Sequence, residues 1–390
     1  MDRPTIRLLH VTTVPMSLTF LTGQVGYVKA RGFEVRAVSS PGKELGEFAA
    51  REGVRADPVP MSRAISPFAD LVALHRLVAK LREWRPHIVH SHTPKGGLLG
   101  MIAAWLARVP VRVYHIRGLP FVTASGARRS LLRWTEKVSC RLAHRVLCVS
   151  HSVRDTAVTE GLCPAQKVIV LAGGSGNGID AAGRFNPQRV EPGTRGTVRA
   201  AYGIPTDAQV IGFVGRLVRD KGIVELAHAW RVLREQFPNV RLLLVGPVEP
   251  RDPVPPQVIQ SLRSDPRAHL TGENWDTPPL YAAMDVVVLP SYREGFPNVP
   301  LEAAAMGLPV VTTTVPGCTD AVLDGVTGML VPAGDDGSLA AALRLYLRDP
   351  DLRRRHGAAG RGRVLAEFRQ EVIWEALYQE YRRLLAAAGL

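Results

Sequence analysis

The sequence predicts an α/β protein with two domains, each built around a parallel β-sheet. Short β-branched runs alternate with amphipathic helical patterns along almost the whole chain. The alternation forms two series, which a Gly- and Pro-rich segment separates. A chain of 390 residues is also longer than one hydrophobic core usually serves. Strands that alternate with helices pair in parallel through right-handed crossovers, so each series is expected to form a Rossmann-like domain.

Several short segments have the composition of strands. The first series has its candidates at residues 5–11, 34–39, 87–90, 111–115, 145–150 and 167–171, and the second at residues 210–215, 240–246, 285–290 and 309–313. Apolar residues at helical spacing mark the segments between them, as in Leu71, Leu74, Val78, Leu81 and Trp84, or in Leu226, Trp230, Leu233 and Phe237.

The domain boundaries follow from composition. Residues 173–196 are rich in Gly and Pro and lack periodicity, which predicts a linker at 176–196. The N-terminal domain is therefore expected at 1–175 and the C-terminal domain at 197–369. Residues 370–390 are predicted to form an amphipathic helix that can pack back on the N-terminal domain.

The composition is that of a globular protein, with 46% apolar and 22% charged residues. The four cysteines have no metal-ligand spacing, which favours a reduced cytosolic protein over a disulfide framework. The N-terminus has an acid at position 2 and only a short apolar run, unlike a signal peptide. The longest apolar stretch, 98–113, is interrupted by Arg108 and Pro110 and is too short to cross a membrane. We therefore expect a soluble protein.

The net charge of +14, from 49 basic and 35 acidic side chains, is the unusual feature of the composition. Such an excess favours anionic partners, which could be nucleic acid, an anionic membrane surface or phosphorylated substrates. The arginine-rich composition of a GC-rich genome would raise the charge as well. Charge alone therefore leaves the partner open.

Charged residues follow the predicted strands of the second series, where α/β sheets bind their ligands. In "GRLVRDKG" (215–222), Gly215 permits a tight turn, and Arg216 and Lys221 place two cations at the strand end. The alternative is a basic turn that leads into a helix. "GENWD" (272–276) precedes a predicted helix and could present backbone groups to a flat base.

A further loop, "SYREGFPN" (291–298), contains Glu294. Pro300 suits the first position of a helix, so the next helix is predicted to begin there, with Glu302 in its first turn. Free amides at the start of that helix would face a phosphate group, and the neighbouring cations would neutralise a diphosphate without a metal ion. The two glutamates would accept hydrogen bonds from hydroxyl groups on either side of it. Alternatively, Glu302 only complements the helix dipole.

Together these residues resemble a known family. "EGFPNVPLE" (294–302) matches the E-x7-E signature of the retaining GT-B glycosyltransferases of family 4, and "GRLVRDKG" is similar to their G-R-L-x-x-x-K-G element. Further similar segments follow in the family's order, at residues 90–100, 114–121, 149–155, 177–187 and 316–332. The N-terminal half most resembles the branch that extends lipid-linked oligosaccharides in bacterial polysaccharide synthesis or protein glycosylation.

The resemblance implies the GT-B architecture, in which two Rossmann-like domains face a central cleft. It also implies a nucleotide-sugar donor, usually a UDP-sugar such as a UDP-N-acetylhexosamine, held mainly by the C-terminal domain. Transfer would retain the anomeric configuration by front-face attack, without a protein nucleophile, a metal ion or another cofactor. We therefore expect a hexosyl- or N-acetylhexosaminyltransferase that acts on a polyprenyl-diphosphate-linked saccharide. It would be cytoplasmic and peripheral on the inner face of the cell membrane.

The resemblance also implies roles for single residues. Glu294 would contact the transferred sugar and Glu302 the ribose, with Gly272 and Glu273 near the nucleoside. The residues implied to hold the donor diphosphate are Arg216, Lys221, Gly295, Phe296, Pro297, Asn298 and Val299. His115 matches a family histidine beside the transferred sugar, which assigns it to catalysis together with Glu294; the alternative is a structural histidine.

The N-terminal domain departs from the family in one respect. Many relatives have a Gly-Gly pair after the first strand, close to the donor phosphates, whereas Gly23 and Gly26 are separated here. No phosphate contact is therefore expected from them. His90, His92 and Lys95 follow another predicted strand and are candidates for contact with an acceptor phosphate.

A basic stripe runs along residues 126–145. Its members recur every four residues and are Arg129, Arg133, Lys137, Arg141 and Arg145. A four-residue repeat drifts by about 40° per step, so the stripe winds along the predicted helix. With Trp134 beside it, the stripe suits an anionic membrane surface or a lipid diphosphate. The alternative is a solvated basic face.

Two other functions compete with sugar transfer. A basic nucleic-acid-binding protein would explain the net charge but would leave the paired glutamates unused, and aromatic residues make up only 6% of the chain. We therefore expect no nucleic acid partner. A nucleotide-sugar epimerase of the same fold would convert the donor without any lipid acceptor.

Overall fold

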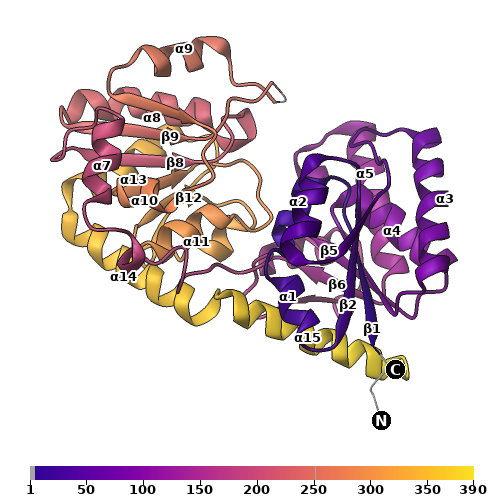
Figure 1. Cartoon of the computed structure of the whole chain (residues 1–390). Coiled ribbons are helices and arrows are strands. Elements are labelled where there is room, and N and C mark those ends of the chain that lie inside the picture. Colours follow the sequence, from indigo (N-terminus) through magenta and orange to yellow (C-terminus); the bar gives the residue numbers. More distant parts are fainter. Residues whose placement is uncertain (1–4, 251) are drawn as a thin grey trace. The chain divides into compact units, whose positions relative to one another are not determined.

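The computed structural model describes residues 5–250 and 252–390. It divides into two compact units, each with its own parallel sheet (Figure 1). The N-terminal unit comprises the chain up to Gly178 together with Gln370–Leu390, and the C-terminal unit comprises Ile179–Arg369. The last helix of the chain therefore belongs to the first unit.

The N-terminal sheet has seven parallel strands in the order β3-β2-β1-β4-β5-β6-β7. The strands are β1 Ile6–Val11, β2 Phe33–Ser39, β3 Arg55–Pro58, β4 Ile88–His92, β5 Val111–Ile116, β6 Arg145–Cys148 and β7 Val168–Val170. Successive side chains alternate between the two faces, as β-strand geometry requires. Leu9 and Val11 therefore lie in one apolar cluster and Leu8 in another.

Helices cover both faces of this sheet. They are α1 Gln24–Lys29, α2 Lys43–Glu52, α3 Pro67–Trp84, α4 Pro94–Leu106, α5 Gly126–Leu142, α6 His151–Thr159 and α15 Gln370–Ala387, with the short 3-10 helices η1 Pro15–Leu21 and η2 Pro120–Thr123. On one face α4 packs between α3 and α5. On the other, α15 packs beside α1 and buries Leu377 and Tyr381 (Figure 1).

The C-terminal sheet has six parallel strands in the order β10-β9-β8-β11-β12-β13. The strands are β8 Gln209–Val214, β9 Val240–Val245, β10 Ala268–Gly272, β11 Val286–Leu289, β12 Val310–Thr313 and β13 Gly328–Val331. From β8 the chain adds strands first on one side and then, from β11 onward, on the other. The strand order therefore reverses between β8 and β11.

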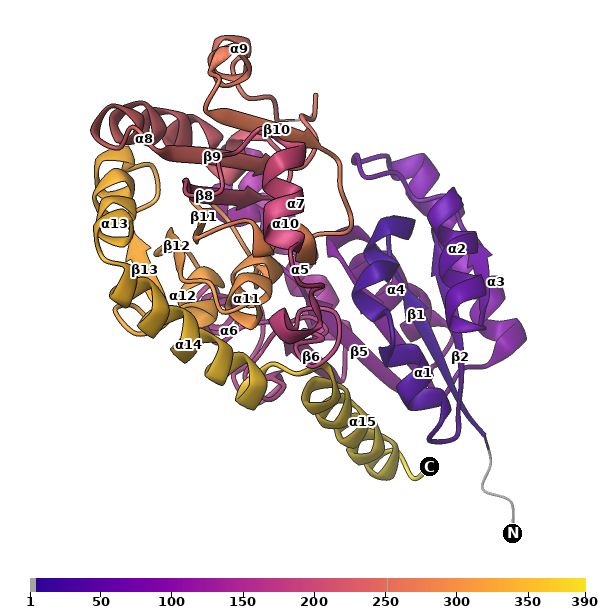
Figure 2. The same cartoon turned by 60° about the vertical axis from the view of Figure 1, so that its left-hand side comes forward.

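Helices again lie on both faces. They are α7 Thr194–Ala201, α8 Ile223–Gln236, α9 Pro256–Ser264, α10 Pro278–Ala282, α11 Asn298–Ala305, α12 Cys318–Ala321, α13 Asp336–Arg348 and α14 Pro350–Glu367, with the 3-10 helices η3 Pro187–Arg189 and η4 Arg219–Lys221. α8 and α13 lie side by side on one face (Figure 2), and α11 packs against α14 on the other. No helix in the described parts of the chain is long and apolar enough to cross a membrane.

Three strands escaped prediction from the sequence, and all three are edge strands. β3 lies at one edge of the N-terminal sheet, and β10 and β13 form the two edges of the C-terminal sheet. β3 reads Arg-Ala-Asp-Pro and buries none of its residues fully. An edge strand has a neighbour on one side only, so its sequence needs no continuous apolar run.

Most of the segment predicted as a linker, 176–196, belongs to the C-terminal unit. Ile179, Ala181 and Phe185 are buried in the core of that unit, and α7 begins at Thr194. The boundary expected at residue 197 therefore moves to Ile179. The segment was predicted as a linker because its Gly and Pro residues interrupt any helical or strand spacing of apolar residues. Its few apolar side chains nevertheless pack in the core.

A buried arginine ties α7 to the sheet. Arg199 is 1% exposed, and it donates hydrogen bonds to the carboxylate of Asp285 at 3.0 Å and to the carbonyl of Ala208 at 2.8 Å. Asp285 precedes β11 and also accepts a hydrogen bond from the amide of Val210 in β8 at 2.7 Å. The network joins the beginnings of β8 and β11, which fixes their register and so the position of their carboxyl ends.

Candidate active site

The loops after β8 and β11 meet at the point where the strand order reverses. Residues 215–222 follow β8, and residues 290–297 follow β11. β8 and β11 are paired neighbours, with Val286 opposite Ile211. In open α/β sheets ligands bind at such a reversal, because the two loops turn away from each other and leave a crevice between them.

Glycines allow the loop after β11 to touch the loops after β8 and β12 through their backbones. Gly222 has a φ of +70°, and a Cβ atom there would lie 2.0 Å from the carbonyl oxygen of Pro290. A Cβ atom on Gly317 would lie 2.3 Å from the carbonyl oxygen of Gly295. No side chain fits at either distance, so glycine is required at both positions.

The two loops are joined by a lysine–glutamate pair. Lys221, at the end of η4, donates a hydrogen bond to the carboxylate of Glu294. Their side chains are 20% and 11% exposed, so the pair is largely shielded from water and strengthened by its charge. The structure thus brings together two residues that the sequence assigned to the diphosphate and to the transferred sugar.

A second contact between the loops lies beside this pair. Arg293 donates to the carboxylate of Asp220 at 2.7 Å, and the amide of Tyr292 donates to the carbonyl of Asp220 at 2.9 Å. Arg216 does not join them. Its side chain is 51% exposed and pairs with Glu249 at 2.8 Å, so it is held at the surface by a partner that solvent screens.

Helix α11 begins two residues earlier than predicted, at Asn298 instead of Pro300. Pro297 precedes it in extended conformation, with φ −73° and ψ 131°. Pro300 is tolerated at the third helical position because the first amides of a helix have no acceptor within it. The first turn therefore contains Asn298, Val299 and Pro300, and Glu302 lies beyond it, which corrects its assignment as a first-turn acid.

Glu302 faces an aromatic partner instead. The hydroxyl of Tyr281, from α10, donates a hydrogen bond to its carboxylate at 2.9 Å. Burial raises the pKa of Glu302, while Tyr281 and the cation of Arg184 oppose the rise. A carboxylate that is half-buried and held by one hydroxyl can still accept a hydrogen bond from a sugar hydroxyl.

Gly272 and Glu273 lie at the end of β10, an edge strand of the C-terminal sheet. Gly272 ends β10 with a φ of +71°, and its carbonyl accepts from the amide of Gly246 at 2.9 Å. Glu273 is exposed. β9 and β8 lie between β10 and β11, so these two residues are separated from Glu294 by two strands.

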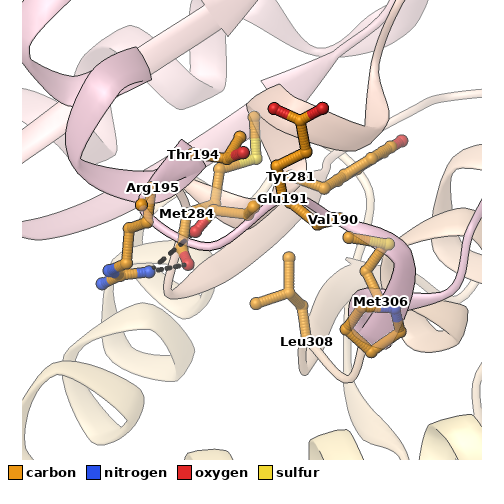
Figure 3. Close-up of a pocket in the computed structure, with 11 residues that line it drawn as sticks. Val190, Glu191, Thr194, Arg195, Tyr281, Met284, Met306 and Leu308 are labelled. Carbon is orange, nitrogen blue, oxygen red and sulfur yellow. Dashed lines mark hydrogen bonds between the residues drawn. The ribbon is translucent and has the colours of Figure 1, made fainter.

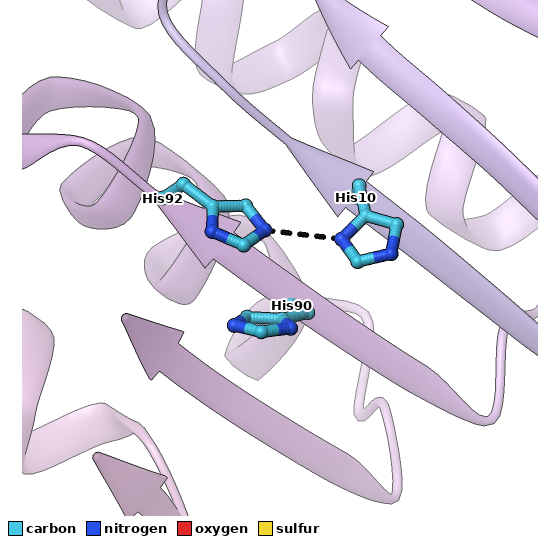
Figure 4. Close-up of side chains that lie close together, drawn as sticks. All are labelled: His10, His90 and His92. Atoms are coloured by element: carbon cyan, nitrogen blue, oxygen red, sulfur yellow. Dashed lines mark hydrogen bonds between the residues drawn. The ribbon is translucent and has the colours of Figure 1, made fainter. Parts of the chain in front are cut away.

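In the N-terminal unit, His115 belongs to a group of four histidines. His10 of β1 lies opposite His90 of β4, and His92 of β4 lies opposite His115 of β5. All four are buried on the same face of the sheet. His10 Nδ1 and His92 Nε2 are 3.0 Å apart (Figure 4), and His90 Nδ1 lies 2.5 Å from the hydroxyl of Tyr381 in α15.

Burial keeps these histidines neutral. It lowers the pKa of His10 to about 3 and the pKa of His90, His92 and His115 well below the usual value, and the cation of Arg117 adds to the effect. Nitrogen atoms of His10, His90 and His92 lie within 4.8 Å of one another, as a metal site would require. The sequence singled out three of the four histidines but not His10, which lies within an ordinary apolar strand.

Comparison with known proteins identifies the family. Residues 208–349 match the family model described as glycosyl transferases group 1, and residues 19–174 match the model described as a glycosyl transferase 4-like domain. The capsular polysaccharide biosynthesis glycosyltransferase CapM of Staphylococcus aureus is 34% identical over 379 residues, which cover 97% of this chain and 97% of that protein. The chain is a group 1 glycosyltransferase.

Other similarities agree with this family. The UDP-Gal:alpha-D-GlcNAc-diphosphoundecaprenol alpha-1,3-galactosyltransferase of Escherichia coli is 29% identical over 75% of this chain and 74% of that protein. A glycosyltransferase from Rickettsia africae ESF-5 superposes with a TM-score of 0.81 at 18% identity, covering 98% of this chain and 99% of that one. Anabaena HepE in complex with UDP and glucose gives 0.78 at 21% identity over 97% and 99%. The glycosyltransferase therefore has the GT-B fold expected from its sequence.

The N-terminal loop glycine of the glycosyltransferase serves packing. The amide of Gly23 donates to the carboxylate of Glu52 at 3.2 Å, and a Cβ atom on Gly23 would lie 2.6 Å from the ring of Trp374. Its amide is thus already hydrogen-bonded within the N-terminal unit.

The cations expected to face the acceptor or a membrane have partners in the glycosyltransferase. Lys95 pairs with Asp70 at 2.8 Å. The stripe on α5 is partly neutralised, because Glu160 pairs with Arg129 at 2.7 Å and with Arg133 at 3.1 Å. Arg145, predicted to continue the stripe, begins β6 instead of lying on the helix, and it pairs with Glu380 at 2.8 Å. Lys137 and Arg141 remain exposed. The stripe is therefore shorter than its sequence repeat suggests.

A cavity of about 340 Å³ lies elsewhere in the C-terminal unit of the glycosyltransferase (Figure 3). Apolar side chains of Val190, Met284, Met306 and Leu308 line it, and Arg195 closes one side by donating to the carbonyls of Ala282 and Met284 at 3.0 Å. Met284 precedes β11 and Leu308 precedes β12, so the cavity is at the amino edge of the sheet. The loops that carry Lys221 and Glu294 are at the opposite edge.

Proposed function

We propose that this glycosyltransferase moves a sugar from a UDP-sugar to a lipid-linked saccharide, with retention of configuration, in the synthesis of a bacterial surface polysaccharide. The observation that carries the proposal is the Lys221–Glu294 pair, held by two loops at the reversal of the strand order. A cation for the diphosphate and a carboxylate for sugar hydroxyls are thereby placed side by side.

The donor assignment uses the chemistry of this edge. Lys221 and the amides at the start of α11 suit a diphosphate, and Arg216 could reach it by leaving its exposed partner Glu249. Glu302, held by Tyr281, suits the ribose. HepE, which shares this fold, was solved with UDP and glucose, and the similar galactosyltransferase of Escherichia coli uses a UDP-sugar by name. We infer a hexosyl or N-acetylhexosaminyl donor.

Catalysis would rest on position and charge. Diphosphate binding draws Lys221 away from Glu294, which frees the carboxylate to orient the sugar, and the cation stabilises the charge that develops on the leaving group. His115 is neutral and its buried Nδ1 has no hydrogen-bond partner among the described residues. The role at the transferred sugar that the family resemblance implies for His115 stays a prediction. The departing phosphate would accept the proton of the acceptor hydroxyl.

Metal independence is part of the proposal, because Lys221 and Arg216 would neutralise the charge of the diphosphate. The sequence contains one Asp-x-Asp pair, Asp349 and Asp351, a spacing that can chelate metal ions. Asp349 caps α14 by accepting from the amide of Leu352 at 2.8 Å, and Asp351 pairs with Arg354. Both carboxylates are thus occupied in helix stabilisation, and we expect chelation of divalent ions to leave turnover unchanged.

The acceptor and the location rest on similarity. CapM acts in capsular polysaccharide biosynthesis, and the galactosyltransferase of Escherichia coli acts on a diphosphoundecaprenol-linked sugar, by their names. We infer a polyprenyl-diphosphate-linked acceptor and a peripheral position on the inner face of the cell membrane. The exposed Trp134, Lys137 and Arg141 of α5 would support contact with anionic lipid.

A donor panel tests this function. UDP-, GDP- and dTDP-sugars are incubated with the purified protein, with and without a bacterial lipid extract, and released nucleotide is measured. We expect release from a UDP-sugar only when the extract is present, and the α-linked product of an α-linked donor. Conversion of the donor without extract would indicate an epimerase. Thermal stabilisation by single-stranded DNA but not by UDP would contradict the proposal.

A further inference from the structure

A guanidinium without a carboxylate lies beside the histidines of the N-terminal unit. Arg117 follows β5 two residues after His115, so both side chains leave the same face of the sheet. Its Nε donates to His92 Nδ1 and its Nη1 to the carbonyl of Gly176, each at 3.3 Å. Within residues 5–250 and 252–390 no acidic side chain pairs with it, and its Nη2 has no hydrogen-bond partner. Burial lowers the pKa of Arg117 to about 10, so it stays charged at neutral pH.

The surrounding imidazoles are incompletely hydrogen-bonded. His90 Nε2 and His115 Nδ1 are buried and have no partner among the described residues. Such atoms are costly unless something binds them. In the part of the chain that the structure describes, no acidic side chain is hydrogen-bonded to any of the four histidines, whereas Arg117 contacts His92. The site therefore has hydrogen-bonding groups and a positive charge without a counter-charge.

The charge decides between two kinds of ligand. The three nitrogens of His10, His90 and His92 could hold a metal ion. A cation there would be repelled by Arg117, whose Nε contacts His92, and would have no carboxylate to compensate it. An anion would be attracted by the same guanidinium and could accept hydrogen bonds from it and from imidazole N–H groups.

We propose that Arg117 and His115 form a phosphate-binding site at the carboxyl edge of the N-terminal sheet, with His92 orienting Arg117 through its Nδ1. The proposal rests on the proposed function, in which donor and acceptor both carry a diphosphate. The C-terminal unit already offers Lys221 and the start of α11 to the donor, so the acceptor diphosphate is the expected occupant.

Calorimetric titration separates the two sources of phosphate. In a Lys221→Ala background, which removes the donor-side cation, the protein is titrated with farnesyl diphosphate and with UDP, with and without Arg117→Gln. We expect Arg117→Gln to weaken the affinity for farnesyl diphosphate at least tenfold and the affinity for UDP less than twofold. Arg117→Lys should recover part of the affinity, and Arg382→Gln, which changes an exposed arginine of α15, should change neither.

Other outcomes are equally decisive. A tenfold loss for UDP as well would keep the phosphate site but assign it to the donor. Unchanged affinity for both ligands in folded Arg117→Gln would overturn the proposal, as would tight binding of Zn²⁺ that His10→Ala abolishes in a protein that ignores farnesyl diphosphate. None of these results depends on turnover, so failure of the proposed function would appear separately, in the donor panel.

A second observation concerns the opposite face of the same sheet. The first turns of α3 expose an apolar surface: Phe68 is 89% exposed, Leu71 64% and Val72 51%, and Ile65 just before the helix is 62% exposed. The buried face of this helix is formed instead by residues such as Leu77. Contiguous exposed apolar residues of this size mark a surface that binds another protein or a membrane.

The charges around this surface point to the occupant. Arg63 and Arg76 are exposed beside it. Asp70, the acid in the first turn of α3, is neutralised by Lys95 at 2.8 Å. An apolar helix face flanked by cations is the pattern of helices that lie in the interface of an anionic bilayer.

We infer that the beginning of α3, from Ile65 to Val72, inserts into an anionic lipid bilayer. The inference differs from the basic stripe of α5, in which Glu160 pairs with Arg129 and Arg133. It would place the N-terminal unit at the membrane where a lipid-linked acceptor resides, and to that extent it rests on the proposed function.

Vesicle sedimentation tests the inference. Binding to vesicles of phosphatidylcholine with phosphatidylglycerol is compared between wild type, Phe68→Ser/Leu71→Ser, the α5 variant Trp134→Ser/Lys137→Ala, and Trp105→Ser, which changes an exposed tryptophan at the end of α4. We expect the α3 variant to lose binding at least tenfold and the α5 variant to lose less than that. The Trp105 variant should match wild type, and wild type should bind neutral vesicles weakly. Loss only in the α5 variant, or a change of oligomeric state instead of vesicle binding in the α3 variant, would overturn it. Transfer to a short-chain soluble acceptor should survive in the α3 variant and reports on the proposed function independently.

Discussion

Glu294 has one partner in the structure and a different one in the proposed reaction. Its carboxylate accepts a hydrogen bond from Lys221. When Lys221 turns to the diphosphate, the carboxylate needs new donors, and sugar hydroxyls supply them. The hydrogen bond to Lys221 therefore holds the Glu294 carboxylate in its orientation before the donor binds.

Glu294→Ala removes that contact with the transferred sugar. We expect turnover to fall about 10²- to 10³-fold, the range seen when one preorganised catalytic hydrogen bond is lost, with UDP affinity nearly unchanged. Released UDP under saturating donor and acceptor measures the effect. Glu235→Ala, an exposed glutamate of α8, is the matched control. Turnover of the Glu294 variant equal to that of the control would contradict the site.

Single buried histidines also set a pH dependence of stability. His10 is almost fully buried, and burial lowers its pKa to about 3, whereas an unfolded histidine titrates near 6.5. As the pH falls, the unfolded chain takes up its proton first. The contribution of neutral His10 to the free energy of unfolding is therefore complete above about pH 6.5 and is lost progressively towards pH 3.

At pH 5 the loss from His10 alone should be about 2 kcal/mol. Urea unfolding at pH 7.5 and pH 5 measures it, and His10→Gln should flatten the difference because it removes one titrating group. The three neighbouring histidines act in the same direction, so the wild-type loss should be larger than this. Equal stability of the wild type at the two pH values would refute the assignment of neutral buried imidazoles.

At the scale of elements, the site depends on how closely two loops approach. The loop after β8 and the loop after β11 touch at Gly222 and Pro290. Lys221 directly precedes Gly222, and Glu294 follows Pro290 later in the same loop. A shift of either loop would separate the pair. The register of β8 against β11, fixed by Arg199 and Asp285, supports the same geometry from the other edge.

Gly222→Ala should separate the loops. Its Cβ would lie 2.0 Å from a carbonyl oxygen, and its φ of +70° is unfavourable for alanine. Gly203 has a φ of +65° and open space around a Cβ atom, so Gly203→Ala isolates the cost of the backbone conformation. We expect Gly222→Ala to lose about 1–3 kcal/mol more than the control, in urea unfolding, together with weaker UDP binding. Equal losses in both variants would show that the loops adjust freely.

At the scale of the whole molecule, the last helix of the chain completes the N-terminal unit. α15 buries Leu377, Tyr381 and Leu384 against the N-terminal sheet, and Tyr381 reaches His90 with its hydroxyl. The N-terminal unit is therefore built from both ends of the sequence, and it can fold fully only after the C-terminal unit has been synthesised.

Tyr381→Ala tests this dependence. Removing a fully buried aromatic side chain costs about 3–5 kcal/mol, and the cost should fall on the N-terminal unit. Hydrogen exchange should show loss of protection in β1 and β4 but not in β8 and β11. Tyr381→Phe keeps the ring and should retain most of that protection. Uniform loss across both units would mean that they unfold together.

The sequence by itself determined the features that depend on local order along the chain. Strand and helix periods gave two series of Rossmann type, and Gly, Pro and charged residues at strand ends marked the loops that hold Lys221 and Glu294. These signals are local because backbone preference and amphipathic period are properties of neighbouring residues. For the same reason the edge strands β3, β10 and β13, which need no apolar run, were missed.

The tertiary structure decided which of these residues meet. Lys221 and Glu294 are 73 positions apart, and only the reversal of strand order between β8 and β11 makes them partners. His10, Arg117 and Tyr381 join His90, His92 and His115 because β1, β4 and β5 are neighbours in the sheet and α15 returns to cover it. The exposed start of α3 was likewise not predicted, because the helical spacing of apolar residues groups Leu71 with residues of the core. Contacts between distant segments follow from sheet order and packing, which no short stretch of sequence contains.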